Sequence, residues 1–258
     1  MLVGVIHLPA LPGSPGAALT AEECARTAMT DARALAAAGY DAIIVENFGD
    51  APFFATRVPP ITVAAMTACA VAVRAAAPGI SLGINVLRND AESALSIAVC
   101  TGASFVRINV HTGARVTDQG LVQGEAATTL RLRRALGAER IGIWADVDVK
   151  HSAPLGAPRP LVQEVEDLTK RGMADVVLVT GEGTGKGVDL EKLAAVKRAS
   201  GKPVLVASGA TLVTLAALAS SADGVVVGSA LREGGTPGGS IDARLATEFA
   251  AAFREAFG

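Results

Sequence analysis

The feature that most constrains the fold is a regular alternation of short apolar runs with helical stretches, repeated eight times along the chain. The runs are rich in Val, Ile and Leu, as the buried strands of a parallel sheet are. Strands and helices that alternate at about 30-residue spacing indicate right-handed βαβ units. Eight such units, with no residues left over for another domain, predict a single α/β domain over residues 1–258, a (β/α)8 or TIM barrel.

The expected elements can be stated as residue ranges. Strands are expected at 2–7, 41–46, 81–86, 104–111, 140–149, 175–181, 203–208 and 224–229. Helices are expected near 20–38, 60–77, 90–101, 121–136, 161–172, 189–199, 210–220 and 240–256. The loops after several strands are long, whereas those before the strands are tight. A TIM barrel carries its functional residues on the loops that follow the strands, so this asymmetry marks the functional face.

Composition narrows the class of protein. The net charge is -2 and no basic stripe is present, which argues against binding to a nucleic acid polymer. No window approaches about 18 uninterrupted apolar residues, so we expect neither a secretion signal nor a membrane span. The three isolated cysteines show no metal-ligand or disulfide spacing, which favours a reducing compartment and a cytoplasmic location. The sequence leaves open whether the protein forms a homo-oligomer.

Polar side chains recur near the carboxyl ends of the expected strands. Because side chains alternate along a strand, one parity faces the helices and the other faces the barrel interior. Val110 and Val149 belong to the parity expected to face the helices. The polar residues expected inside or at the strand ends are His7, Glu46, Asn85, Arg107, Asn109, His111, Asp146, Asp148, Lys150, Thr180 and Ser208. A buried ion pair of Arg107 with Glu46 or Asp146 would explain part of this set. Burying so many charges without a ligand is costly, so we interpret the whole set as a ligand pocket.

Glycine-containing turns follow the last two expected strands. They are Ser208-Gly209 and Gly228-Ser229. Glycine lets a ligand approach the backbone closely, and a helix that follows offers free N–H groups. The loops after the seventh and eighth strands are the usual phosphate site of TIM barrels. We therefore predict phosphate binding at Ser208, Gly209, Gly228 and Ser229, together with Gly181 after the sixth strand. Tight turns without a ligand are the alternative.

The glycine-rich run at 181–187 does not satisfy the P-loop pattern. Thr180 stands where the first glycine is required, and Gly187 follows Lys186 where Ser or Thr is required. We interpret the run as a flexible loop that closes over the phosphate, with Lys186 more simply read as a solvated lysine than as a ligand contact.

Three phenylalanines lie in the loop after the second strand. Phe48, Phe53 and Phe54 account for three of the nine aromatic residues. They are suited either to walling a ligand pocket or to burying a subunit contact, and the sequence does not decide between the two.

Seven segments resemble the BtpA family. They are GVIHLPALPGSP (4–15), DAIIVENFGDAPF (41–53), LGINVLRNDA (82–91), RINVHTGARVTDQGL (107–121), ADVDVKHSAPL (145–155), VTGEGTG (179–185) and VVVGSAL (225–231). The resemblance implies a TIM barrel similar to ribulose-phosphate-binding barrels, with phosphate held at the two glycine-containing turns. The family is named for a link to photosystem I assembly, whereas relatives in non-photosynthetic organisms imply a more general role. The resemblance implies no particular reaction.

The leading hypothesis is an enzyme that acts on a small phosphorylated sugar or nucleotide-like substrate. The candidate catalytic residues are Glu46, Asp146, Asp148, Lys150 and His7, and the candidate substrate-binding residues are Asn85, Arg107, Asn109, His111 and Thr180. Carboxylates in differently polar surroundings serve as general acid and base. Lys150 would stabilise developing negative charge or form a Schiff base. The reaction class stays open among isomerisation or epimerisation, lyase chemistry and glycosidic cleavage.

Two other functions are alternatives to this hypothesis, and a bound divalent metal is a further possibility. A non-catalytic assembly factor for photosystem I or another membrane complex would need an exposed apolar surface, for which the phenylalanine loop is the candidate. A sensor would bind a phosphometabolite in the same pocket without turnover. The cofactor is unknown. Divalent metal ligands are available in His7, Glu46, His111, Asp146 and Asp148, but no HxH, HExxH or EF-hand spacing is present, so a metal is not favoured.

Overall fold

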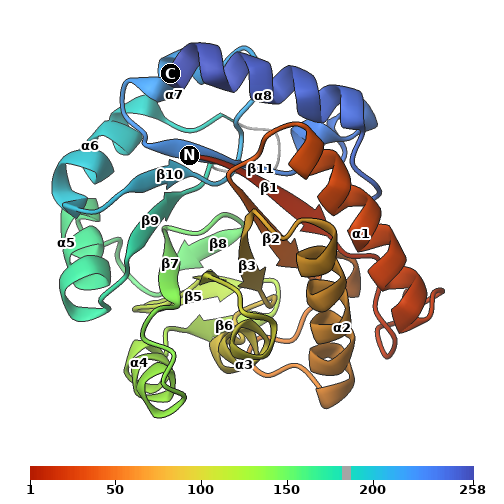
Figure 1. Cartoon of the computed structure of the whole chain (residues 1–258). Helices are drawn as coiled ribbons and strands as arrows, with labels where there is room; N and C mark the ends of the chain where they lie inside the picture. Colours follow the sequence, from red (N-terminus) through yellow and green to blue (C-terminus); the bar gives the residue numbers. More distant parts are fainter. Residues whose placement is uncertain (182–186) are drawn as a thin grey trace.

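Eight parallel strands form a closed barrel in a computed structural model that describes residues 1–181 and 187–258 (Figure 1). In chain order the strands are β1 (Leu2–His7), β2 (Ala42–Glu46), β3 (Ser81–Asn85), β4 (Phe105–Ile108), β7 (Gly142–Val147), β9 (Val176–Val179), β10 (Val204–Val206) and β11 (Gly224–Val227). Each strand pairs with the next, and β11 pairs with β1 to close the barrel. The TIM-barrel prediction is therefore confirmed, although several strands end earlier than expected.

Helices surround the barrel (Figure 1). They are α1 (Ala21–Ala37), α2 (Pro60–Ala76), α3 (Ala91–Thr101), α4 (Ala126–Ala135), α5 (Leu161–Glu166), which continues into the π-helical turn η2 (Asp167–Arg171), α6 (Leu190–Ser200), α7 (Leu215–Ala219) and α8 (Ala243–Phe257). Side chains of Thr20, Asp90, Asp189 and Asp242 accept hydrogen bonds from the first backbone N–H groups of α1, α3, α6 and α8. Each such cap stabilises its helix by about 1 kcal/mol. The expectation for 210–220 was wrong in extent, since α7 has five residues.

The long loops after β4 and β7 fold into a separate antiparallel sheet. Its strands are β5 (Ala114–Thr117), β6 (Gly120–Gln123) and β8 (Ser152–Pro154), in the order β6-β5-β8. The sequence pattern predicted loops here and a helix from 121, which was wrong because residues 120–123 pair with β5 in a hairpin, to which β8 adds a third strand from a distant loop. Val122 of β6 packs against Val110 and Val149. These two valines therefore face the small sheet rather than the helices.

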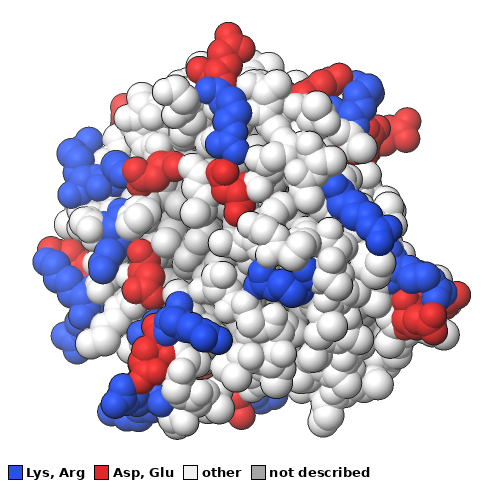
Figure 2. Space-filling model, in the orientation of Figure 1, with Lys and Arg blue, Asp and Glu red and all other residues white. Residues whose placement is uncertain are grey.

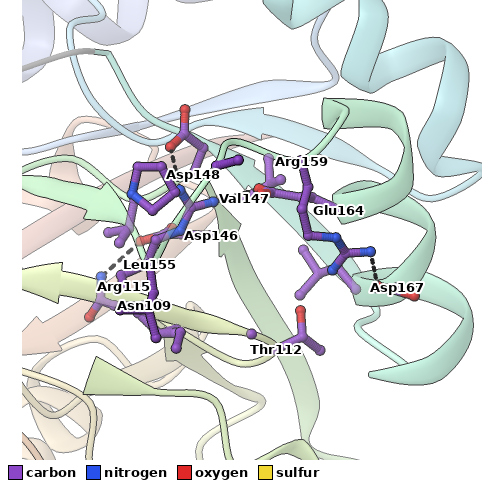
Figure 3. Close-up of a pocket in the computed structure, with 17 residues that line it drawn as sticks. Asn109, Thr112, Arg115, Asp146, Val147, Asp148, Leu155, Arg159, Glu164 and Asp167 are labelled. Atoms are coloured by element: carbon purple, nitrogen blue, oxygen red, sulfur yellow. Dashed lines mark hydrogen bonds and ion pairs between the residues drawn. The ribbon is translucent and has the colours of Figure 1, made fainter. Parts of the chain in front are cut away.

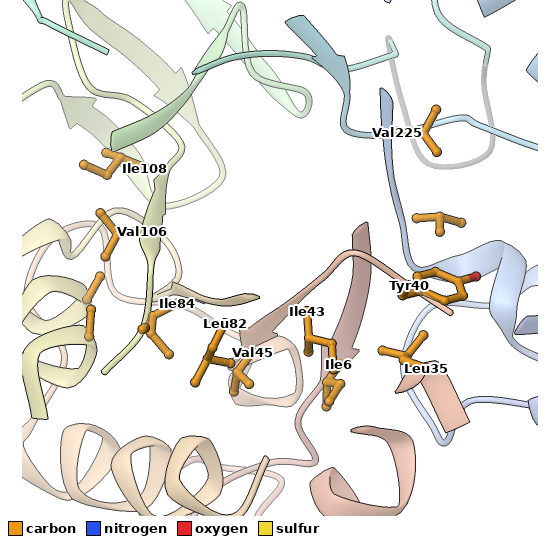
Figure 4. Close-up of a cluster of buried hydrophobic side chains, with 14 of the residues drawn as sticks. Ile6, Leu35, Tyr40, Ile43, Val45, Leu82, Ile84, Val106, Ile108 and Val225 are labelled. Atoms are coloured by element: carbon orange, nitrogen blue, oxygen red, sulfur yellow. The ribbon is translucent and has the colours of Figure 1, made fainter. Parts of the chain in front are cut away.

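Apolar side chains fill both faces of the barrel wall. The outer layer packs the strands against the helices, and Figure 4 shows part of it, including Ile6, Ile43, Val45, Leu82, Ile84, Val106 and Ile108. The opposite parity fills the interior with Val3, Val5, Ala42, Ile44, Phe105, Trp144, Leu178, Leu205, Ala207 and Val226. Full burial of one such aliphatic side chain is worth about 1.5–3 kcal/mol, so this alternation fixes the register of the strands.

Two stacked rings fill the barrel interior below the carboxyl ends of the strands. The ring centroids of Phe105 and Trp144 lie 3.7 Å apart, at an interplanar angle of 11°. Gly83 on β3 makes room for them, since a Cβ at this position would lie 2.2 Å from the Phe105 ring. Arg107 and Asp146 follow two residues later on the same two strands. The rings therefore form an apolar layer beneath these charged side chains.

Charged side chains of both signs are interspersed over the face drawn in Figure 2, and much of its middle is uncharged. Within the described part of the chain, no helix is long and apolar enough to cross a membrane.

Candidate functional site

A cavity of about 400 Å³ opens at the carboxyl ends of the barrel strands. Its walls include His7, Glu46, Phe48, Phe53, Arg88, Arg107, Asn109, Lys150, His151, Ser208, Gly209, Gly228 and Ser229. The structure thus brings together many of the predicted site residues, from loops far apart in the sequence. Asn85, His111, Asp146, Asp148, Thr180 and Gly181 are not among the residues that line this cavity.

The loops after β10 and β11 form one side of the cavity and offer unengaged donors to it. Among the described residues, no acceptor is found for the backbone N–H groups of Ser208, Gly209, Ala210, Ser229 and Ala230. The hydroxyls of the two serines likewise bond to no described residue. The sequence predicted that helix N-termini would supply such donors. Instead, β11 leads into a single 3-10 turn, η3 (Ser229–Leu231), and a loop separates β10 from the short α7.

A buried arginine that sequence reasoning missed supports this side of the cavity. Arg232 is 3% exposed and donates to the carbonyl groups of Gly228, Val5 and Gly239 at 2.7, 3.1 and 3.0 Å. Gly228 has little room for a side chain, because a Cβ there would lie 3.0 Å from His7 Nε2. No sequence periodicity singles out Arg232, since it follows a strand end and binds backbone atoms.

His7 enters the cavity with a defined tautomer. Its Nδ1 accepts a hydrogen bond from the Gly238 backbone N–H at 3.0 Å, so a neutral ring carries its proton on Nε2. The ring stacks on Phe48 with a centroid separation of 4.4 Å. Burial first, and then nearby cations, lower the pKa of His7 to about 2. His7 is therefore neutral at physiological pH, and its Nε2 lies 3.8 Å from Glu46 Oε1.

A buried polar network holds Arg107 against Asp146. Arg107 Nε and Nη2 donate to the two carboxylate oxygens of Asp146 at 3.2 and 3.1 Å, and Asn109 Nδ2 donates to Asp146 Oδ2 at 2.8 Å. Asn85 Nδ2 in turn donates to Asn109 Oδ1 and to the Arg107 carbonyl group. The ion-pair alternative thus applies to Arg107 and Asp146, while Asn85 links β3 to β4 beneath the cavity. Glu46 accepts no hydrogen bond from a described side chain, and its Oε2 lies 3.9 Å from Arg107 Nη1.

Lys150 lines the cavity, although β7 ends earlier, at Val147. Thr180 Oγ1 accepts a hydrogen bond from the Lys150 backbone N–H at 3.1 Å, so Thr180 positions this segment rather than facing the cavity. Burial, followed by the charge of Arg107, lowers the pKa of the Lys150 ammonium group. Arg88, which sequence reasoning missed, donates from Nη2 to the Lys150 carbonyl group at 2.9 Å. Its position in a loop, outside the strand alternation, explains why no pattern marked it.

Asp148 lies in a second, smaller cavity of about 180 Å³, lined in part by Arg115 of β5 and Pro154 of β8 (Figure 3). It pairs with Arg115 at 3.0 Å and with Lys192, and Arg115 also pairs with Glu164. The parity prediction was wrong for Asp148 because β7 ends at Val147 and Asp148 has a positive φ of 53°. Strand alternation does not continue through such a backbone.

His111 is likewise displaced from the predicted pocket. It is 1% exposed, and its Nε2 bonds to the Gly172 carbonyl group at 2.8 Å. Burial lowers its pKa. Since β4 ends at Ile108, the inward parity predicted for His111 does not apply. Gly181 is buried after β9, and Lys186, with the rest of 182–186, lies outside the described residues.

Of the five potential metal ligands, His7 and Glu46 face one another, whereas His111 and Asp148 lie elsewhere. In the described ranges, no three His, Cys, Asp or Glu side chains are grouped in a way that would hold a metal ion.

The phenylalanine loop is divided between two environments. Phe48 and Phe53 line the cavity, whereas Phe54 is 57% exposed. Two of the three rings therefore wall the pocket, as one of the two alternatives predicted.

Comparisons with known proteins place this fold in a family. The model of the BtpA family matches residues 1–255. The photosystem I biogenesis protein BtpA of Synechocystis is 46% identical over 98% of this chain and 88% of its own length. An uncharacterized protein of Pyrococcus horikoshii is 42% identical over 96% and 94%, and one of Caenorhabditis elegans is 32% identical over 96% and 91%.

Solved structures share the fold at low sequence identity. KGPDC from Streptococcus mutans has a TM-score of 0.61 and 12% identity, covering 100% of this chain and 98% of that one. Phosphoribosyl anthranilate isomerase from Thermus thermophilus has a TM-score of 0.58 and 15% identity, covering 99% of each. These likenesses show a TIM barrel, and the family match over residues 1–255 shows that the chain belongs to the BtpA family.

Proposed function

We propose that this protein is an enzyme that binds a small phosphorylated sugar or nucleotide-like molecule at the mouth of the barrel and catalyses proton transfer on it. The observation that carries the proposal is the division of the cavity into two chemically different sides. One side presents unengaged backbone donors, and the other presents a carboxylate, a neutral imidazole and a lysine.

In this proposal, the loops after β10 and β11 bind the phosphate group. Backbone N–H groups that converge in a concave turn bind anions, and these two loops are the usual phosphate site of TIM barrels. The hydroxyls of Ser208 and Ser229 add two further groups able to donate to phosphate oxygens. A phosphate bound there would be held mainly by backbone donors.

Glu46 is the proposed general base. Both oxygens of Asp146 already accept hydrogen bonds from Arg107 or Asn109, so Asp146 is better suited to positioning Arg107 than to exchanging protons. Glu46 faces the cavity with no comparable partner among the described residues. A neutral imidazole beside such a base can polarise a carbonyl oxygen by donating a hydrogen bond from Nε2, which is the role we assign to His7.

The same geometry favours some reaction classes over others. Glycosidic cleavage by the common mechanism uses two carboxyl groups that flank the scissile bond. Of the acidic residues considered, Glu46 lines the cavity, while Asp146 is bound to Arg107 and Asp148 lies in the second cavity. This supports isomerisation, epimerisation or lyase chemistry. Lys150, with its lowered pKa, is suited to protonating an oxyanion or to forming a Schiff base.

The test is hydrogen exchange at a substrate carbon. The full chain would be incubated in D₂O with a panel of ketose and aldose phosphates and nucleoside monophosphates, and NMR would report exchange or conversion. We expect exchange with at least one sugar phosphate, and we expect Glu46→Gln to reduce its rate by about 10²–10⁴-fold while ligand binding is retained.

A matched control is Glu22→Gln on the surface of α1, where the side chain is 82% exposed. It should exchange at the wild-type rate. The enzyme proposal fails if no panel member exchanges or reacts, or if Glu46→Gln is as fast as the control. Binding without turnover would instead indicate a sensor.

An assembly role is the alternative that the name of the Synechocystis relative favours. The relatives from Pyrococcus horikoshii and Caenorhabditis elegans are uncharacterized, so their names favour no role. If a Glu46→Gln variant fully replaced the wild-type protein in the cell, an assembly role would be the better account.

A further inference from the structure

Two cations that line the cavity, Arg88 and Lys150, have no carboxylate partner among the described residues. The loops after β10 and β11 are the proposed phosphate loops. Arg88 follows β3, which lies opposite β10 in the closed barrel, and Lys150 follows β7, which β9 separates from β10. Arg88 is 8% exposed, and its guanidinium group makes one hydrogen bond, to the Lys150 carbonyl group. Within the described ranges, Lys150 Nζ has neither an ion pair nor a hydrogen bond.

None of the nearby carboxylates pairs directly with Arg88 or Lys150. Asp146 is taken up by the bidentate pair with Arg107. Glu46 lies 3.9 Å from Arg107. Asp118 acts on the charge of Arg88 without an ion pair or hydrogen bond to it. In the described part of this wall, Arg88 and Lys150 therefore have no carboxylate within ion-pair distance. Buried charge that lacks a partner is costly, which indicates that a bound anion completes the set.

We infer that the ligand carries a second anionic group, a carboxylate or a phosphate, which Arg88 and Lys150 bind at the end away from the phosphate loops. This inference rests on the proposed function and narrows its substrate class to small phosphorylated sugars with an anion at each end. The free N–H groups of an arginine fit the oxygens of a carboxylate or phosphate in pairs, and a lysine adds a point charge.

The electrostatics of the wall agree with this assignment. Burial first lowers the pKa of Arg88 and of Lys150, the positive charge of Arg107 lowers both further, and Asp146 and Glu46 act in the opposite direction. An anion placed between them would raise the pKa of both groups. The cavity volume of about 400 Å³ falls in the range of small-molecule sites.

The experiment compares ligands that differ by one anionic group. Isothermal titration calorimetry of the full chain would use glucose 6-phosphate against 6-phosphogluconate, and fructose 6-phosphate against fructose 1,6-bisphosphate. The first pair adds a carboxylate, and the second adds a phosphate. We expect at least one doubly anionic ligand to bind about tenfold or more tightly than its partner, and the pair that shows this identifies the group.

Variants connect the preference to the two cations. Arg88→Gln and Lys150→Met should each remove most of the preference, and Arg88→Gln should change the affinity for the monophosphate by about twofold or less. Arg26→Gln on α1, whose side chain is 57% exposed, is the matched control and should keep the full preference. Thermal unfolding of each variant verifies that it is folded.

The possible outcomes distinguish failure of this inference from failure of the proposed function. If monophosphates bind but a second anion adds nothing, or if the preference persists in both variants, this inference is wrong and the proposed function stands. If no phosphorylated ligand binds at all, the proposed function fails and the inference fails with it. If Lys150→Met alone is misfolded, the Arg88→Gln result decides.

Discussion

Replacing Asp146 with Asn should destabilise the fold strongly, because among the described residues it leaves the buried charge of Arg107 with only the more distant carboxylate of Glu46, 3.9 Å away. Arg107 is 6% exposed, and the Asp146 side chain is fully buried. Although burial by itself lowers the pKa of Arg107, the charges of Asp146 and Glu46 outweigh it, and the pKa lies above its ordinary value. The carboxylate thus holds the arginine charged in the barrel interior.

The expected loss follows from that geometry. Breaking a buried ion pair by removing one partner costs about 3–5 kcal/mol. In Asp146→Asn, the amide NH₂ must also face donors of Arg107 or Asn109, because Asp146 accepts three hydrogen bonds from them. For a chain of this length, 1 kcal/mol shifts Tm by about 2–4 °C, so we expect a fall of roughly 10 °C. Urea unfolding followed by circular dichroism gives the free energy directly.

A matched control lies two residues further along the chain. Asp148→Asn removes a carboxylate that is 40% exposed and paired with Arg115 and Lys192, and ion pairs at partly exposed sites contribute about 0–1 kcal/mol. The double substitution Arg107→Met with Asp146→Leu should recover much of the stability lost in Asp146→Asn, since it removes both charges. The reasoning is refuted if Asp146→Asn costs no more than Asp148→Asn, or if the double substitution is no more stable than Asp146→Asn.

Two other predictions concern Gly83 and His7. Gly83→Ala should cost about 1–3 kcal/mol, because its Cβ would lie 2.2 Å from the Phe105 ring, whereas Gly79→Ala meets nothing within 4 Å and should be near neutral in urea unfolding. The pKa of His7 falls from its unfolded value near 6.5 to about 2 on folding, so the unfolded state binds more protons between these pH values. The His7 contribution to stability is therefore complete above pH 6.5 and declines by about 1.4 kcal/mol per pH unit below it. His7→Asn should remove this part of the slope between pH 6.5 and 5, and an unchanged slope would contradict a neutral, buried His7.

The alternation of apolar residues proved sufficient to predict the barrel. One parity of side chains packs against the helices, as Ile84, Val106, Ile108 and Ile143 do. The other parity, which includes Phe105, fills the barrel interior. A slip of one residue would exchange the two sets, so the pattern fixes the register of each strand. The β5–β6–β8 sheet was not predictable in the same way. Its strands are short, and although β5 and β6 form a local hairpin, β8 joins them from a loop farther along the chain.

The same limit applies to the site. His7, Glu46 and Arg107 lie on strands, and parity placed them correctly toward the interior. Asp148 and His111 lie beyond the observed strand ends, where the backbone turns away and alternation carries no information. Arg88 and Arg232 were missed because both lie in loops and are fixed by hydrogen bonds to backbone carbonyl groups of distant segments.

The sequence by itself thus determined a TIM barrel and the glycine-containing turns after β10 and β11. These features follow from local periodicity and from glycine positions, which are properties of each segment of the sequence by itself. Only the tertiary structure decided that Asp146 belongs to Arg107, that Glu46 is left facing the cavity, and that Arg88 and Lys150 lie there without a carboxylate partner in the described chain. The pairing of charges depends on distances between strands and loops that close the barrel, and such distances exist only once the chain has folded.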